Sequence, residues 1–258
     1  DLCEVRGVQR PFSAIDYSGV LPFGKWEKLR PVVSAFQFKS WKFKASADSN
    51  QNRQRIVDMQ TLLGKDTPLR MDANGGWEFE QAREHITTAL ALGVNSFEQP
   101  LDKSDENGSQ KLVAAFGKDA HIMADESLCS WADAQQLIAS KACNHFSLKL
   151  SKNGGLFNTL RIYQLAQNNG IPCQLSAHYG ETSILSAAGA LLASLAPNLT
   201  ACEGALGTYL LSEDITPTPF MVNKAGQVQA TDLSFMGWPV QVEEARVKKY
   251  GAGDKVLR

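Results

Sequence analysis

The sequence predicts an α/β fold in which a parallel β-sheet closes into a TIM-type (β/α) barrel. Eight short β-rich segments follow one another along the chain, separated by longer segments with helical spacing, which is typical of parallel strands with crossover helices. The length of 258 residues is also close to the roughly 250 residues of a closed barrel. An open doubly wound sheet would fit the alternation as well. However, no Gly-rich phosphate loop follows the first strand, and eight units favour closure.

The expected elements alternate in order, and the strands cover residues 12–21, 41–44, 69–72, 94–98, 121–125, 146–149, 171–175 and 199–202. The expected helices cover residues 25–36, 50–63, 78–92, 106–116, 131–139, 156–168 and 182–195. Gly64, Gly93 and Gly117 fall where three of these helices should end. The alternation stops at Gly207, so we divide the chain into a barrel over residues 1–206 and a tail over residues 207–258 that packs on it.

Composition narrows the class of protein. Apolar residues make up 43% and charged residues 21% of the chain, which is enough to bury a core. The 26 Lys and Arg residues nearly balance the 27 Asp and Glu residues, and this argues against nucleic acid as a partner. The longest strongly apolar stretch, residues 187–196, is much shorter than the roughly 20 residues that span a bilayer, so we expect no membrane-embedded part.

The cysteines indicate a reducing compartment. The chain has five, they form no CxxC pair, and they lie far apart at Cys3, Cys129, Cys143, Cys173 and Cys202. Reduced thiols of this kind are typical of the cytoplasm. The N-terminus also lacks a basic and then apolar signal pattern. We therefore expect a cytoplasmic protein.

Three acidic residues end successive expected strands. Asp72, Glu98 and Asp125 are one βα unit apart each time, and neighbouring strands lie about 5 Å apart. We therefore expect the three carboxylates at one height at the C-terminal mouth of the barrel, where barrel enzymes keep their chemistry. Three anions so close need a cation, and all-oxygen ligands favour Mg²⁺, with Mn²⁺ as the second choice.

Lysines form a second set at the mouth. Lys42 and Lys44 alternate with Phe43, so both point to the opposite face from Phe43. Lys149 ends the sixth expected strand, diametrically opposite the second, so Lys44 and Lys149 should face each other across the metal. Beside a metal and other cations, a lysine pKa should fall until the amine can act as a general base.

Two further residues lie near the seventh expected strand. His178 stands at its end and could touch a substrate or make a structural hydrogen bond. Glu181 opens the following helix, where an acidic residue is favoured electrostatically.

The motifs together resemble a known family. The segments 42–44 (KFK), 69–77 (LRMDANGGW), 96–101 (SFEQPL), 122–128 (IMADESL) and 148–155 (LKLSKNGG) are similar to the enolase superfamily. The muconate-lactonizing subgroup fits best, which includes muconate cycloisomerases, o-succinylbenzoate synthases and dipeptide epimerases. Residues 237–242 resemble the closing strand of that family.

The resemblance implies a reaction. A metal ion, normally Mg²⁺, binds a substrate carboxylate, and a lysine removes the adjacent proton to give an enediolate. It further implies that Asp72, Glu98 and Asp125 bind the metal, and that Lys44 and Lys149 are the acid/base pair, assisted by Lys42. Asn74 and Glu126 would be near neighbours of this set. The partner would be a small carboxylate, and cycloisomerisation, dehydration (as in o-succinylbenzoate synthase) and epimerisation all stay open.

Departures from the family pattern leave alternatives. The mandelate-racemase branch, which includes acid sugar dehydratases, pairs an Asp on strand six with a His on strand seven, whereas here Lys149 stands on strand six. Residues 202–205 (CEGA) lack the paired aspartates of dipeptide epimerases. Family members also carry an N-terminal capping domain, which we expect to be absent from this sequence. A bare barrel should be a weak catalyst, or even a binding protein, with an apolar surface beside its mouth that leaves a homo-oligomer open.

Overall fold

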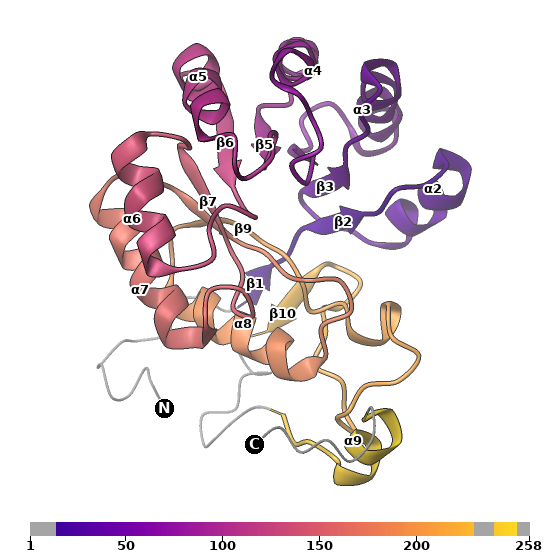
Figure 1. Ribbon diagram of the computed structural model, residues 1–258. Helices are drawn as coiled ribbons and strands as arrows, with labels where there is room; N and C mark the ends of the chain where they lie inside the picture. The colour runs from indigo at the N-terminus through magenta and orange to yellow at the C-terminus, as the bar shows by residue number, and fades with distance from the viewer. Residues whose placement is uncertain (1–13, 230–239, 252–258) are drawn as a thin grey trace.

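An eight-stranded parallel sheet forms the centre of the protein, and the computed structural model describes residues 14–229 and 240–251. Its strands are neighbours in the order of the sequence, from β2 to β9. They are β2 (Gly19–Leu21), β3 (Trp41–Lys44), β4 (Leu69–Asp72), β5 (Ser96–Glu98), β6 (His121–Ala124), β7 (His145–Leu148), β8 (Cys173–Leu175) and β9 (Leu199–Cys202). Figure 1 shows this sheet curling, with helices around its outside. The expected barrel of eight parallel strands is therefore confirmed.

Seven helices connect these strands: α2 (Trp26–Ala35), α3 (Ser49–Leu63), α4 (Phe79–Ala91), α5 (Glu106–Phe116), α6 (Trp131–Ser140), α7 (Gly155–Asn168) and α8 (Ser183–Leu195). Local sequence explains several of their ends. The Asp48 carboxylate accepts hydrogen bonds from the first backbone N–H groups of α3, and Ser130 and Asp133 form a capping box at the start of α6. Gly64, just after α3, has the positive φ that glycine tolerates best.

The prediction of one continuous first strand is wrong, because the structure divides this segment into two strands, β1 (Ala14–Asp16) and β2. Strand β1 pairs antiparallel with β10 (Gln227–Gln229) in a separate two-stranded sheet. Residues 12 and 13 of the expected strand lie outside the described residues. After the break, the Ser18 N–H donates to the Cys202 carbonyl over 2.7 Å. This bond links the first and last segments of the barrel wall.

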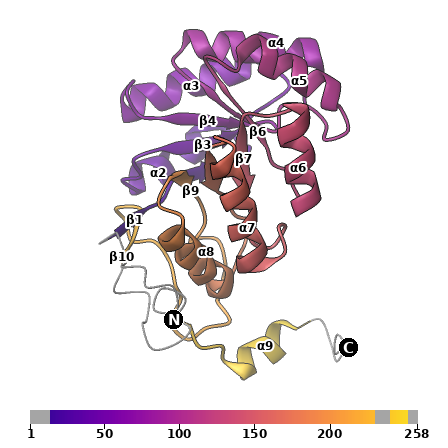
Figure 2. The same ribbon diagram turned by 90° about the vertical axis from the view of Figure 1, so that its left-hand side faces the viewer.

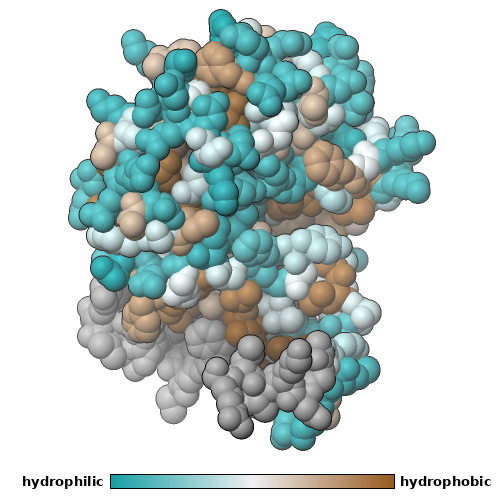
Figure 3. All heavy atoms as spheres, viewed as in Figure 1, coloured by the Kyte–Doolittle hydropathy of each residue, from teal (hydrophilic) through white to brown (hydrophobic). Residues whose placement is uncertain are grey.

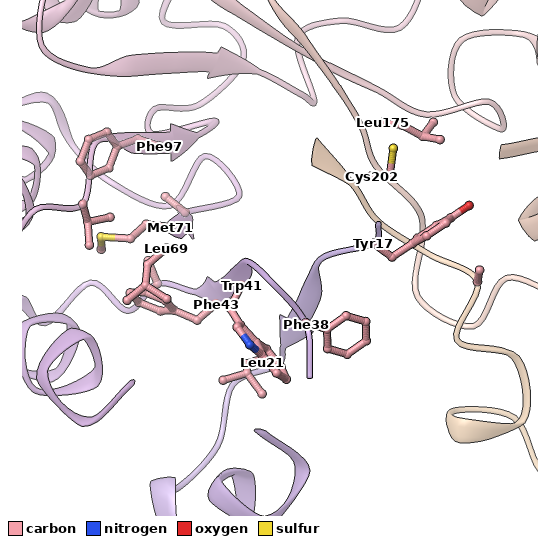
Figure 4. Close-up of a cluster of buried hydrophobic side chains, with 14 of the residues drawn as sticks. Tyr17, Leu21, Phe38, Trp41, Phe43, Leu69, Met71, Phe97, Leu175 and Cys202 are labelled. Carbon is pink, nitrogen blue, oxygen red and sulfur yellow. The ribbon is translucent and has the colours of Figure 1, made fainter. Parts of the chain in front are cut away.

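Large apolar side chains fill the space between the strands and the outer helices. Trp41, Phe43, Phe97 and Phe146 are almost completely buried, and Figure 4 shows the first three of these in one cluster with Leu69 and Met71. Gly19 is required beside this cluster, because a Cβ atom there would lie 2.3 Å from the Trp41 ring. Trp41 and Phe43 occupy one face of β3, so Lys42 and Lys44 are left for the other face.

The tail is closely attached to the barrel. The Asp214 carboxylate is fully buried and accepts hydrogen bonds from the backbone and hydroxyl of Ser183, the first residue of α8, at 2.9 Å each. A short 3₁₀ helix, η1 (Gly207–Tyr209), and helix α9 (Glu244–Tyr250) complete the described tail. Figure 2 shows α9 at the end of the molecule opposite α3 and α4. Residues 237–239 of the expected closing strand lie outside the described residues, and residues 240–242 form no strand.

The structure also describes most of the cysteines and the lengths of the helices. Cys129, Cys143, Cys173 and Cys202 are free thiols, while Cys3 lies outside the described residues. Over residues 14–229 and 240–251, no helix has both the length and the apolarity needed to cross a bilayer. Figure 3 shows a largely hydrophilic surface with apolar patches on the face seen in Figure 1.

Candidate active site

The sheet register brings two of the expected metal ligands side by side. Lys44 is the register partner of Asp72, and Asp72 is the partner of Glu98. The expectation of equal height fails for Asp125, because Glu98 is paired with Met123 and Asp125 stands two residues further along. Barrel strands are staggered relative to one another, so equal spacing in the sequence does not give equal height.

Lys42 lies at the centre of a buried cluster of charges. Its Nζ atom is 2.7 Å from Glu98 Oε2, 2.7 Å from Glu203 Oε2 and 3.4 Å from Asp72 Oδ2. Burial acts to lower the pKa of Lys42, but the carboxylates, Glu203 foremost, outweigh it and raise the pKa well above its ordinary value. Lys42 is therefore a fixed cation that holds the carboxylates together.

Lys44 contacts the exposed side of the same cluster. Its Nζ atom donates to Asp72 Oδ2 at 2.7 Å and to Asn74 Oδ1 at 2.6 Å. The Asn74 amide in turn donates to Glu126 Oε1 at 3.0 Å. Asn74 has a positive φ of 49°, which Asn tolerates better than most residues. Asn74 and Glu126, which the resemblance implies as near neighbours of the site, thus contact each other, and Asn74 contacts Lys44.

Two lysines hold Asp125. Lys149 Nζ lies 2.5 Å from Asp125 Oδ2, and Lys152 Nζ lies 2.5 Å from Asp125 Oδ1. Lys152 also donates to the Asp125 carbonyl oxygen. Lys152 belongs to the same LKLSKNGG segment as Lys149 but was not predicted as a site residue, because strand periodicity cannot place a residue in the loop after a strand.

The expected lowering of a lysine pKa does not hold for Lys149. Burial acts to lower its pKa, but Asp125 and Glu98 outweigh burial and raise it. The expectation assumed cations around the lysine, whereas in the folded chain its closest charged neighbour is a carboxylate. The chain alone thus stabilises Lys149 as an ammonium.

Two more residues that the sequence analysis did not assign to the site organise it. Glu203, just after β9, also contacts Arg70, with Glu203 Oε1 3.0 Å from Arg70 Nη2. Gln99 accepts hydrogen bonds from the backbone N–H of Asp125 and from Ser127, so it fixes the loop that carries Asp125. The SFEQPL segment contains Gln99, but only the resemblance, and not residue spacing, could have drawn attention to it.

His178 and Glu181 lie together at the edge of the mouth. His178 Nδ1 is 2.7 Å from the Ser151 hydroxyl, and its backbone N–H donates to Glu181 Oε1 at 2.8 Å. Burial raises the pKa of Glu181. Among the described residues, no carboxylate is paired with the His178 ring, so the His–Asp pair of the mandelate-racemase branch has no counterpart here.

Large apolar side chains are exposed around the same end of the barrel. Phe23 and Tyr179 lie in the segments after β2 and β8, and Phe157 lies in the first turn of α7; these residues are 64–81% exposed. Whether they form the expected apolar surface beside the mouth stays a prediction.

The carboxylate oxygens of Asp72, Glu98 and Asp125 are ligands of the type that a hard divalent cation prefers. Burial, and then the charge of Glu98, raise the pKa of Asp72, so negative charge there is incompletely balanced and a cation would relieve it. In residues 14–229 and 240–251, however, no three Asp, Glu, His or Cys side chains are already grouped so as to hold a metal ion. Lysine ammonium groups occupy the carboxylate oxygens, and they would have to move for a metal to bind.

Comparisons with known proteins identify relatives. Residues 27–245 match the family model described as enolase C-terminal domain-like. An L-Ala-D/L-Glu epimerase of Francisella tularensis subsp. novicida is 32% identical over 140 residues, which are 54% of this chain and 39% of the epimerase. A chloromuconate cycloisomerase of Cupriavidus pinatubonensis is 29% identical over 217 residues, covering 81% of this chain and 56% of that enzyme.

The fold comparison gives the same picture. The muconate lactonizing enzyme of Pseudomonas putida superposes with a TM-score of 0.83 at 26% identity, covering 96% of this chain and 68% of that one. The chain spans 39% to 56% of the length of the curated relatives named above.

Proposed function

Because the chain belongs to the enolase C-terminal domain-like family, we propose that it is the barrel of an acid/base enzyme that removes the proton next to a substrate carboxylate. The observation that carries this proposal is the gathering of lysines and carboxylates in one site. Five cations, Lys42, Lys44, Arg70, Lys149 and Lys152, are paired with four carboxylates, Asp72, Glu98, Asp125 and Glu203. In such a site the lysine ammonium groups can stabilise the negative charge that develops on a substrate as its proton leaves.

The residues divide into roles. Lys44 and Lys149 approach the site from β3 and from the end of β7, so one can take the proton and the other can stabilise or reprotonate the carbanion from its other side. Lys42 and Arg70 are held by Glu203 and keep the buried floor positive. Asp72, Glu98 and Asp125 would hold Mg²⁺, or Mn²⁺, which supplies Lewis-acid stabilisation of the substrate carboxylate.

The named relatives are cycloisomerases and epimerases, and we propose one of these reactions, or a dehydration, for the complete protein. We further propose a small-molecule carboxylate as substrate and the cytoplasm as compartment. The pairing of His178 with Ser151 disfavours a mandelate-racemase-type reaction, which would need a His–Asp pair.

Deuterium exchange tests the proposal directly. The protein is incubated in D₂O with Mg²⁺ and a set of carboxylates, and α-deuterium is measured by mass spectrometry. Lys44→Ala and Lys149→Ala should each lower exchange on the order of 10²-fold or more, since each removes a proton carrier. Lys118→Ala, at an exposed position, is the control and should exchange normally. Near-normal exchange in either site variant would refute the two-lysine mechanism, and saturable carboxylate binding without exchange would identify a binding protein instead.

Calorimetry tests the metal site separately. Wild-type protein should bind one Mg²⁺, and Asp72→Asn or Asp125→Asn should weaken binding because each removes a charged oxygen ligand. Equal Mg²⁺ affinity in all three proteins would place the metal elsewhere.

A further inference from the structure

A small cavity of about 10 Å³ borders the charged cluster at Glu203. It is bounded by the segment between β1 and β2, by β8, by α8 and by the residues that follow β9. Part of its wall is apolar, from Leu150, Leu175 and Gly189. Figure 4 shows one side of this region, where Tyr17 lies beside Cys202 and Leu175.

Three buried polar atoms on residues that line this cavity receive or donate no hydrogen bond within the described part of the chain. They are Tyr17 Oη, Ser186 Oγ and Glu203 Oε1. The three residues are only 3%, 3% and 4% exposed. Glu203 Oε1 lies 3.0 Å from Arg70 Nη2, yet the contact is not directed as a hydrogen bond. Buried polar groups in native proteins rarely stay unpaired, so three around one cavity point to a common partner.

We propose that this cavity is a binding site for one water molecule, which joins Tyr17, Ser186 and Glu203. The volume of about 10 Å³ is about what one water needs, and buried waters typically make about three hydrogen bonds to otherwise unsatisfied groups. The two hydroxyls can donate to the water oxygen, and the water can donate to the Glu203 carboxylate. The apolar part of the wall leaves little for a larger ligand to bind.

The water would contact a carboxylate of the charged site. It connects three elements that are distant in sequence to the carboxylate that holds Lys42 and Arg70. Glu203 Oε2 lies 2.7 Å from Lys42 and Oε1 lies 3.0 Å from Arg70, and the water adds a further partner that restrains the carboxylate. The water thereby acts as a positioning group for the cations of the site, and this inference does not depend on the reaction proposed above.

A crystal structure at about 1.5 Å resolution tests the site itself. We expect one electron-density peak within hydrogen-bonding distance, about 2.6–3.2 Å, of at least two of the three atoms. An empty cavity at that resolution, or a direct hydrogen bond between two of the three side chains that closes it, would overturn the proposal.

The sign of a stability change gives a second, independent test. If water is bound, Tyr17→Phe removes a satisfied hydrogen bond and should lower the melting temperature by about 2–4 °C. If the cavity is dry, the same substitution removes a costly unpaired hydroxyl, and the melting temperature should rise or stay constant. Tyr163→Phe is the matched control, because the Tyr163 hydroxyl already accepts from the Asn198 backbone N–H. A Tyr17→Phe shift opposite in sign to the control shift contradicts the proposal.

Gly189→Ala separates the two states in another way. The added methyl would enter the cavity wall 3.5 Å from Leu175 Cδ2 and 3.9 Å from Leu150 Cδ1, without a clash. Alanine is the better helix former, so in a dry cavity this variant should melt higher than wild type. Displacement of a bound water should cancel that gain or reverse it, and a clear rise in melting temperature would count against the water.

Discussion

Glu203→Gln should destabilise the fold by removing the counter-charge of a buried arginine. Arg70 is 7% exposed, and the Glu203 carboxylate is the only one within salt-bridge distance of it among residues 14–229 and 240–251. After the substitution Arg70 keeps only neutral acceptors, Gln174 Oε1 and Ser18 Oγ, at 2.6 Å each. Lys42 is less affected, because it keeps Glu98 at 2.7 Å.

The expected size follows from the cost of an unpaired buried charge. Breaking a buried ion pair from one side costs about 3–5 kcal/mol. For a domain of this length that corresponds to a decrease of roughly 6–20 °C in melting temperature. Glu80→Gln is the control, because the exposed Glu80–Arg83 pair should contribute little to stability.

A double-mutant cycle identifies the cause. Urea unfolding is measured for Glu203→Gln, Arg70→Met and the double variant. If the stranded arginine causes the loss, the double variant should be more stable than the sum of the two single losses predicts, by about 1–3 kcal/mol. Additivity within about 0.5 kcal/mol would show that Arg70 and Glu203 do not stabilise each other, and the reasoning would fail.

Three further predictions concern stability. Burial, and then the nearby His121, lower the pKa of His145 to about 3, below the usual 6.5 or so of an unfolded chain. The unfolded state therefore binds this proton first, and the free energy of unfolding should decrease as the pH falls from about 6.5 towards 3. Urea unfolding at several pH values should show a smaller decrease in this free energy for a His145→Gln variant. Asp214→Asn should cost about 3 kcal/mol in the same assay, since an amide nitrogen would face two of the four donors that Ser183 and Thr216 direct at the carboxylate; an unchanged midpoint would contradict this. Gly19→Ala should lower the melting temperature or prevent folding, because its Cβ atom would overlap the Trp41 ring; a soluble variant that melts like wild type would refute the packing argument.

The fold was predictable from the sequence where local patterns decide it. Several βα units combine a buried strand with a capped helix or with a glycine at the helix end, and the unit with Asp48 and Gly64 has all three. The division of the first strand was not predictable in this way. β1 leaves the barrel because it pairs with β10, and that partner lies in the tail.

The candidate site was predictable in its residue types and only partly in its contacts. Strand spacing placed Asp72 and Glu98 beside each other, as the register shows, whereas the pairing of Lys44 with Asp72 is a finding of the structure. Lys152 and Glu203 follow strand ends, and the path of a loop determines what they touch. The raised pKa of Lys149 could not be foreseen either, since it depends on the position of Asp125 in the loop after the neighbouring strand β6.

The pairing of β1 with β10 has a consequence for how the protein is made. The Gln227 amide donates to the carboxylate of Asp16, 211 residues earlier in the chain. During synthesis β1 therefore leaves the ribosome long before its partner β10. At about 5–20 residues per second, this delay lasts on the order of ten to forty seconds. During this interval the edge of β1 is unpaired, and it can pair with another nascent chain instead. Slower translation or a truncated tail should therefore increase aggregation during synthesis.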